Sequence, residues 1–126
     1  MKVKISTPVF PTEDEPKIMK ALEKYFPEIK FKATKKEISG ETDKLFSLNL
    51  LRDRIIERQI KNTVRYLMLQ YKTDAGSRLL LNKQTFIIGK INFVEENYSL
   101  GNVVIDIETD NLEHAIDYMT GIAREA

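Results

Sequence analysis

Basic side chains recur on one side of the segment 48–72, which contains no Gly or Pro and is predicted to be the chain's longest helix. Their spacings of four, three, four and seven positions place them within an arc of about 60°. They are Arg54, Arg58, Lys61, Arg65 and Lys72. This cationic ridge is about 27 Å long at 1.5 Å per residue. Arginine and lysine on a rigid helix can neutralise phosphates, so the spacing predicts contact with the backbone of a nucleic acid.

Amide and basic side chains elsewhere extend the predicted contact. Asn62 lies at the edge of the ridge, Lys83 and Gln84 follow a predicted strand, and Lys90 comes shortly after them. Amides can hydrogen-bond to bases and to sugar hydroxyls. The predicted RNA-contacting residues are therefore Arg54, Arg58, Lys61, Asn62, Arg65, Lys83, Gln84 and Lys90. The alternative is that the ridge is the solvated side of an ordinary surface helix, since any such helix carries charge opposite an apolar stripe.

No residue pattern in the chain is typical of catalysis. The absence of Cys excludes a thiolate nucleophile and a disulfide, and the single histidine, His114, is expected at the surface of the last helix. Gly89 and Lys90 do not form a phosphate loop, because Ile91 stands where Ser or Thr is required. The acidic run 12–15 is better explained by helix capping, with Thr12 and Glu15 as a capping box, than by a magnesium site. We expect a non-enzyme with no catalytic residues, no metal and no cofactor.

The composition predicts one soluble domain over residues 1–126, with 42% hydrophobic and 31% charged residues. No apolar run approaches the roughly 18 residues that span a membrane, and the N-terminus lacks the apolar region of a signal peptide, so we expect a cytoplasmic protein without membrane contact. The net charge of +1 hides an asymmetry, because residues 95–126 carry −7 and residues 1–94 carry +8. The two parts can attract each other within one molecule or across a dimer.

The alternation of apolar and polar residues predicts an α+β fold with two layers: a mostly antiparallel sheet of about five strands, with about three helices on one face. The predicted strands are 1–10, 28–38, 78–82, 87–93 and 103–108, with turns at 39–41 and 95–102. A first helix buries Ile18, Ala21, Leu22 and Tyr25, and a last helix, capped by Asp110 or Asn111, buries Leu112, Ala115, Ile116, Met119, Ile122 and Ala123.

Two surfaces of this predicted fold admit more than one interpretation. The uncovered face of the sheet would carry Lys2, Lys4, Lys30, Lys32 and Lys90. These lysines would either form a second cationic surface or pair across strands with Asp106 and Glu108. Leu48, Leu51 and Ile55 lie on a different side of the long helix from its later apolar residues. A kink, a separate first turn or a dimer interface would each explain that offset.

Several runs of residues resemble an archaeal family of predicted exosome subunits or RNA-binding proteins. The similar runs are Pro11-Thr12-Glu13-Asp14, the stretch 58–65, Leu81-Asn82-Lys83-Gln84 followed by Gly89-Lys90, and Leu100-Gly101. The chain departs from the family pattern at Asn62, where Asp is common, and at Thr85-Phe86, where small alanines are usual. The resemblance implies a fold similar to the ribosomal protein that binds 5S rRNA, and by that analogy a role with RNA.

We therefore expect a non-catalytic RNA-binding protein that contacts the RNA backbone through the basic ridge, accessory to RNA processing or to ribosome function. A remote alternative is an enzyme that acts on RNA. The main alternative is a protein-interaction module, a homodimer or a subunit of a larger RNA-processing complex. In that case the basic helix would meet an acidic partner surface, with Leu48, Leu51 and Ile55 as interface anchors.

Overall fold

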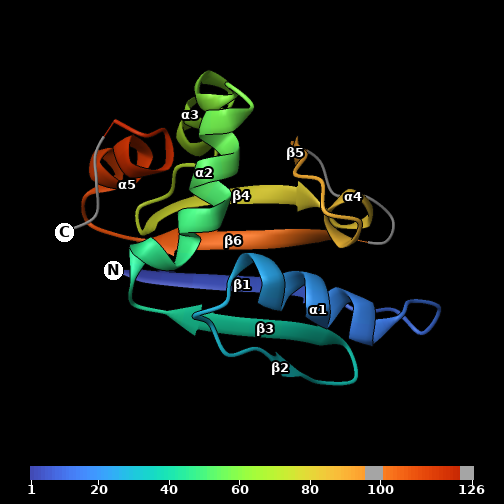
Figure 1. Ribbon diagram of the computed structural model, residues 1–126. Helices are drawn as coiled ribbons and strands as arrows, with labels where there is room; N and C mark the ends of the chain where they lie inside the picture. Colours follow the sequence, from blue (N-terminus) through green and yellow to red (C-terminus); the bar gives the residue numbers. More distant parts are fainter. Residues whose placement is uncertain (96–100, 123–126) are drawn as a thin grey trace.

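Strand β1 (Lys2–Pro8) lies between two neighbours in the middle of the sheet, and its residues alternate between buried and exposed. Val3, Ile5 and Thr7 are buried on one face, while Lys2 and Lys4 are exposed on the other. The computed structural model describes residues 1–95 and 101–122, and it shows an open six-stranded sheet in the order β2-β3-β1-β6-β4-β5 (Figure 1). All neighbouring strands run antiparallel; the other strands are β2 (Lys32–Ala33), β3 (Glu37–Thr42), β4 (Gly76–Asn82), β5 (Phe93–Val94) and β6 (Asn102–Glu108).

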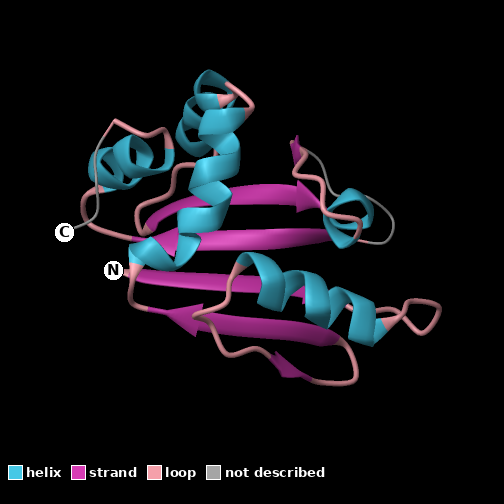
Figure 2. Cartoon of the chain, viewed as in Figure 1, coloured by secondary structure: helices cyan, strands magenta, loops and turns pink. Residues whose placement is uncertain are grey.

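The helices pack on one face of the sheet, which gives the two layers predicted from the sequence (Figure 2). They are α1 (Glu15–Tyr25), the 3₁₀ turn η1 (Leu45–Leu48), α2 (Asn49–Glu57), α3 (Lys61–Gln70), α4 (Lys83–Ile87) and α5 (Leu112–Met119). The prediction of an antiparallel α+β fold is confirmed. The predicted buried set of α1 is confirmed residue by residue, and Val103, Ile105 and Ile107 form a buried row on β6.

The predicted single helix over 48–72 is wrong, because the chain turns between α2 and α3. The amide of Gln59 donates to the carbonyl of Ile56 at 3.1 Å, and that of Ile60 donates to Ile55 at 3.2 Å. These two bonds are the pattern of a Schellman motif, which places the intervening residue in the left-handed region. Gln59 has φ 57° and occupies the position that is usually glycine. The sequence therefore lacks the glycine that would have predicted the end of this helix.

The turn at Gln59 explains the offset between the two apolar sets. Leu48, Leu51 and Ile55 are completely buried in the chain's own core. Because the chain turns at Gln59, α2 packs these residues into the core, and α3 packs its own set, Val64, Leu67 and Met68, into the same core. The three residues are thus core residues and not anchors of a dimer interface. Ile56 of α2 points away from the core and is 41% exposed.

Two predicted strands are also corrected. Most of 28–38 is loop, and the predicted turn at 39–41 lies inside β3; the true hairpin turn is held by the Thr34 hydroxyl, which accepts from the amides of Lys36 and Glu37 at 3.2 Å. The predicted strand 87–93 is also wrong: helix α4, whose N-cap Asn82 accepts from the Thr85 amide at 3.0 Å, ends at Ile87, residues 88–92 form a linking segment, and only the two-residue strand β5 follows. Short polar side chains therefore set both boundaries.

Helix caps were predicted with partial success. The N-cap of α1 is Asp14, which accepts from the Lys17 amide at 3.3 Å, so the predicted capping box at Thr12 is wrong. The predicted cap Asn111 is confirmed by its bond from the His114 amide at 3.1 Å. Ile122, expected inside, is 65% exposed. Most of the predicted turn at 95–102, and the predicted inward residue Ala123, lie outside the described residues.

Candidate nucleic-acid interface

A basic cleft of about 340 Å³ forms between the C-terminal end of α2 and the segment that links α4 to β5. Helix α2 contributes Arg54 and Arg58, and the linking segment contributes its residues 89–92, which include Lys90 and Asn92. Arg54, Arg58 and Lys90 are exposed, and no described residue that lines the cleft is acidic. Positive charge from two elements therefore converges on one concave surface, where a low-dielectric wall strengthens its field.

Backbone contacts fix the wall of the cleft opposite α2. The Tyr25 hydroxyl of α1 donates to the Gly89 carbonyl at 2.9 Å, and the Lys90 amide donates to the Thr85 carbonyl at 2.9 Å. Ile91 is buried. Gly89 has φ +88°, a conformation that side chains rarely adopt, although a Cβ atom there would meet nothing within 4 Å. Glycine is required at this position for its backbone conformation and not for space.

The two arginines differ in how firmly they are held. The Arg58 guanidinium donates through Nη1 to the Ile91 carbonyl across the cleft, which joins α2 to the linking segment. Arg54 lies 3.9 Å from Glu57, and the two side chains are 48% and 64% exposed. An ion pair that exposed and that long contributes little, because water and salt screen it. Arg58 is thus oriented in advance, while Arg54 remains free to meet an anion.

The remaining ridge residues are not in this cleft. Beyond the turn at Gln59, Lys61 and Asn62 are exposed, and Lys61 borders a separate hollow with Ile56, Thr120 and Gly121. Arg65 bonds to the Thr120 hydroxyl at 3.1 Å and lies 3.6 Å from Asp117 of α5. The basic helix therefore meets part of the acidic C-terminal region within one molecule.

Lys83 is a buried structural residue in this structure. Its side chain is 0% exposed, and its ammonium donates to Glu13 Oε1 and to the Pro8 carbonyl, both at 2.7 Å. Gln84, which is exposed, donates to Glu13 Oε2 at 3.3 Å. Lys83 cannot reach a ligand while these contacts hold.

The Glu13 carboxyl shows the effect of that network. Burial by itself would raise the pKa of Glu13. The hydrogen bonds from Lys83, from the Phe10 amide and from Gln84, together with the charge of Lys83, outweigh burial and hold the pKa below its ordinary value. Glu13 is therefore ionised at neutral pH and ties the loop after β1 to the start of α4.

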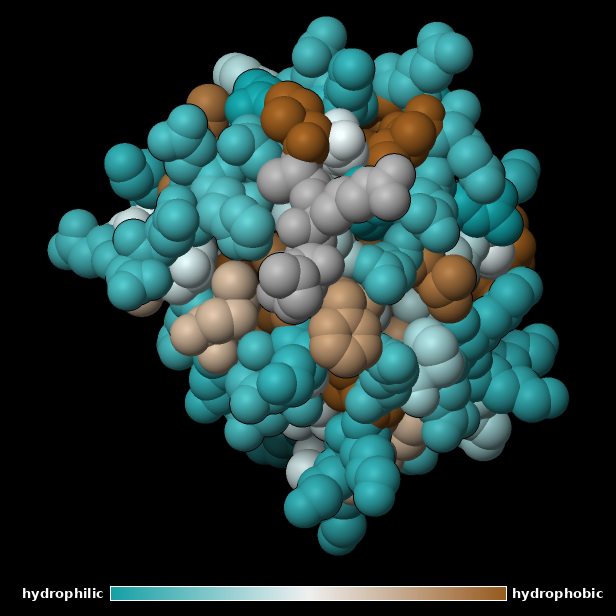
Figure 3. All heavy atoms as spheres, turned by 60° about the vertical axis from the view of Figure 1, so that its left-hand side comes forward, coloured by the Kyte–Doolittle hydropathy of each residue, from teal (hydrophilic) through white to brown (hydrophobic). Residues whose placement is uncertain are grey.

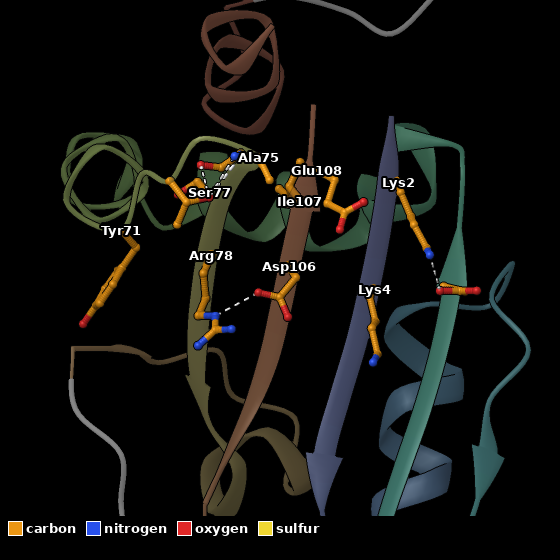
Figure 4. A pocket seen from close by; sticks show the side chains of 12 residues that line it. Lys2, Lys4, Tyr71, Ala75, Ser77, Arg78, Asp106, Ile107 and Glu108 are labelled. Atoms are coloured by element: carbon orange, nitrogen blue, oxygen red, sulfur yellow. Dashed lines mark hydrogen bonds and ion pairs between the residues drawn. The ribbon is translucent and has the colours of Figure 1, made fainter. Parts of the chain in front are cut away.

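The open face of the sheet carries both signs of charge around a hollow of about 590 Å³ (Figure 4). Arg78 bonds to Asp106 at 2.8 Å, and Lys2 lies 3.2 Å from Glu41. Lys4 stands opposite Asp106 on β6 and Glu41 on β3. Lys90 is not on this face, because it belongs to the segment after α4. The prediction that this lysine joins a second cationic sheet surface is wrong, and acids pair with Lys2 and Arg78 on the open face.

The comparisons with known proteins assign the chain to a family. A family model described as RNA binding matches residues 2–110. The chain belongs to this family. A UPF0201 protein of Methanothermobacter thermautotrophicus is 31% identical over 119 residues, which cover 94% of this chain and 89% of that protein. Another, from Sulfurisphaera tokodaii, is 30% identical over 128 residues and covers 94% and 86% of the two chains.

Solved structures show the same fold. The crystal structure of an uncharacterized UPF0201 protein has a TM-score of 0.82 and 26% identity, and the match covers 100% of this chain and 98% of that chain. The UPF0201 protein from Methanococcus jannaschii has a TM-score of 0.79 and 24% identity, with 98% and 96% covered. The second likeness is one of fold alone. This RNA-binding family is thus the context in which the basic cleft has to be interpreted.

Helix α1 carries a further basic surface that was not among the predicted RNA contacts. Lys17, Lys20 and Lys24 of α1 border a hollow of about 580 Å³ together with Ala21, Ile87 and Ile88. The spacing i, i+3 and i+7 puts the three lysines on one side of a helix, so the sequence did hold the signal. Only the buried residues of this helix were predicted, and helix α4, which forms the other side of the hollow, was not predicted.

Within residues 1–95 and 101–122, no group of three or more His, Asp or Glu side chains could hold a metal ion. Over the same residues, each helix is too short or too polar to cross a membrane.

Proposed function

We propose that this protein binds RNA without catalysing a reaction, and that the cleft between α2 and the segment after α4 contacts the RNA backbone. The observation that carries this proposal is the convergence of Arg54, Arg58 and Lys90 on one concave surface whose described lining residues include no acid. The cations come from positions far apart in the sequence. The family description supports RNA as the polyanion.

Each cleft residue has a distinct task in this proposal. Arg58 uses one N–H to bind the Ile91 carbonyl, which leaves the rest of its guanidinium donors for a phosphate. Arg54 can bind the same or the next phosphate in the fork geometry that arginine favours, and Lys90 adds a point charge. The amide of Asn92 can bond to a base edge or to a ribose hydroxyl. Affinity should therefore come mainly from the backbone, with little sequence preference.

The finer parts of the proposal rest on the resemblance found in the sequence. An accessory role in RNA processing, in association with the exosome or the ribosome, is one such part. Contact through Lys61 and Asn62 rests instead on the helical spacing of the ridge, since both continue the exposed surface past Gln59. Lys83 and Arg65 are left out because both are engaged within the protein.

The test compares two triple variants that lose the same charge. The variant Arg54→Gln/Arg58→Gln/Lys90→Gln alters the cleft, while Lys35→Gln/Lys36→Gln/Lys44→Gln alters exposed lysines after β2 and β3, near the opposite edge of the sheet. Binding to a panel of short RNAs is measured from about 50 to 200 mM salt. The cleft variant should flatten the slope of log K against log salt by about 2, since each phosphate contact of a single strand contributes about 0.7.

The proposal fails if wild-type protein binds no RNA at low salt. It also fails if the control variant loses as much affinity and slope as the cleft variant, because net charge and not the cleft would then govern binding. Arg54→Gln/Lys90→Gln serves as a check on folding, since it leaves the Arg58–Ile91 hydrogen bond intact. The slope change of this double variant should be about two thirds of that of the triple variant.

A dimer that uses the residues predicted from the sequence has no support. Leu48, Leu51 and Ile55 are buried in the core, and Arg65 is occupied by Asp117. On the side of the molecule that carries the N-terminus and α5, the apolar spheres of the described residues form small groups among hydrophilic ones (Figure 3). RNA binding is therefore the function that the structure supports best.

A further inference from the structure

The hollow between α1 and α4 combines an aliphatic floor with a cationic rim. Ala21, Ile87 and Ile88 provide the apolar surface, and Ile88 is 69% exposed. The rim consists of Lys17, Lys20 and Lys24, all exposed, in a row about 10 Å long at 1.5 Å per residue. The protein leaves most of the apolar surface of Ile88 uncovered, and lysines surround it. This surface is therefore suited to a ligand that is both apolar and anionic.

The lysine row is not neutralised by the protein. Among the described residues, none of the ion pairs of 4 Å or less involves these three lysines. On the open face of the sheet, by contrast, Lys2 pairs with Glu41 and Arg78 pairs with Asp106. Unpaired lysines repel one another, and a polyanion that bridges them removes this repulsion while releasing its own counterions.

A single chain segment separates this hollow from the basic cleft. Ile87 and Ile88 border the hollow, and the residues that follow, 89–92, border the cleft. The segment is fixed from the α1 side, because Tyr25 donates to the Gly89 carbonyl. Figure 1 shows α1 and α2 on the same face of the sheet, with α4 beside α1 at the end of β4. The two cationic surfaces therefore lie on either side of residues 87–92.

We infer that the RNA bound by this protein is single-stranded, and that it crosses residues 87–92 with an unpaired base in the α1–α4 hollow and its backbone in the cleft. This inference rests on the proposed function. The apolar floor decides for a single strand, because an A-form duplex keeps the faces of its bases stacked inside and presents only phosphates, ribose hydroxyls and base edges to a protein. An unpaired base brings an apolar face and a phosphate together, which matches the floor and the rim.

The test uses full-length protein with a short oligouridylate and a fully paired RNA hairpin as probes. Lys17→Gln/Lys20→Gln/Lys24→Gln should weaken oligouridylate binding about 100-fold near 0.1 M salt and flatten the salt slope by about 2. Ile88→Ser should weaken it roughly tenfold, the effect of losing contact with about two methylene groups, without changing the slope, since no counterion is involved. All four residues are exposed, so both variants should melt like wild type.

The outcomes separate this inference from the proposed function. If wild type binds the hairpin more tightly than the oligouridylate, or if the α1 and Ile88 variants bind both RNAs normally while the cleft variant does not, the single-strand inference is overturned and RNA binding stands. If wild type binds neither probe, RNA binding itself fails. Vesicles with anionic lipids provide the last arm: binding that the α1 variant loses, with RNA binding unchanged, would assign the hollow to a membrane surface and overturn the inference.

Discussion

Replacing Lys83 by methionine should destabilise the protein strongly, because it removes one partner of a buried ion pair. The Lys83 side chain is 0% exposed and that of Glu13 is 7% exposed. In the variant the Glu13 carboxylate keeps the Phe10 amide and Gln84 but loses its counter-charge, and the Pro8 carbonyl loses its donor. Breaking a buried pair from one side costs about 3–5 kcal/mol. Urea denaturation at neutral pH measures the loss.

The dependence on pH identifies the cause of that loss. In the wild-type protein the folded pKa of Glu13 lies below its ordinary value of 4.5, so the pair stabilises the fold above that pH and the stabilisation disappears as pH falls through the folded pKa. In Lys83→Met the burial remains while the main contact that lowers the pKa is gone, so the carboxyl becomes neutral more readily. The difference in unfolding free energy between the two proteins should therefore shrink as the pH drops below 4.5.

A double variant and an RNA measurement complete the design. Lys83→Met/Glu13→Gln removes both charges and should recover most of the lost stability, since replacing a buried pair by neutral groups is often close to neutral. If the single variant costs less than about 1 kcal/mol, or if its cost is the same at pH 4 and pH 7, the pair does not hold the loop as described. Folded Lys83→Met should keep the wild-type salt slope for RNA, because the ammonium is not available to a phosphate.

Three smaller changes test the elements around the site. Leu51→Ala should lower the unfolding free energy by about 2–5 kcal/mol at every protein concentration, because Leu51 is in the core; a cost that varied with concentration in urea melts would indicate an interface instead. Gln59→Gly should raise stability by up to about 1 kcal/mol, since glycine adopts the left-handed conformation without strain, and a lower melting temperature would contradict the Schellman turn. Gly89→Ala should cost about 1–2 kcal/mol through its backbone alone; an unchanged melting temperature would refute the positive φ.

The sequence predicted the layers of the fold because alternation and helical periodicity are local. The buried face of α1 and the inward rows of β1 and β6 follow directly from residues two, three or four positions apart. The end of α2 could not be predicted, because local preference does not place glutamine in the left-handed region. The burial of Ile55 before the turn and of Val64 after it holds Gln59 in that conformation. Helix α4 was not predicted because its five residues, between the predicted strands 78–82 and 87–93, are too few to show a helical period.

The candidate site divides in the same way. The sequence by itself determined which residues carry charge, so Arg54, Arg58 and Lys90 were all named from it as candidates. Only the tertiary structure decided which cations share a surface: it buries Lys83 against Glu13, turns Arg65 to Asp117, and brings Lys90 across to α2. The physical reason is that charge belongs to a residue type, whereas access to solvent and distance to an opposite charge depend on how distant segments pack.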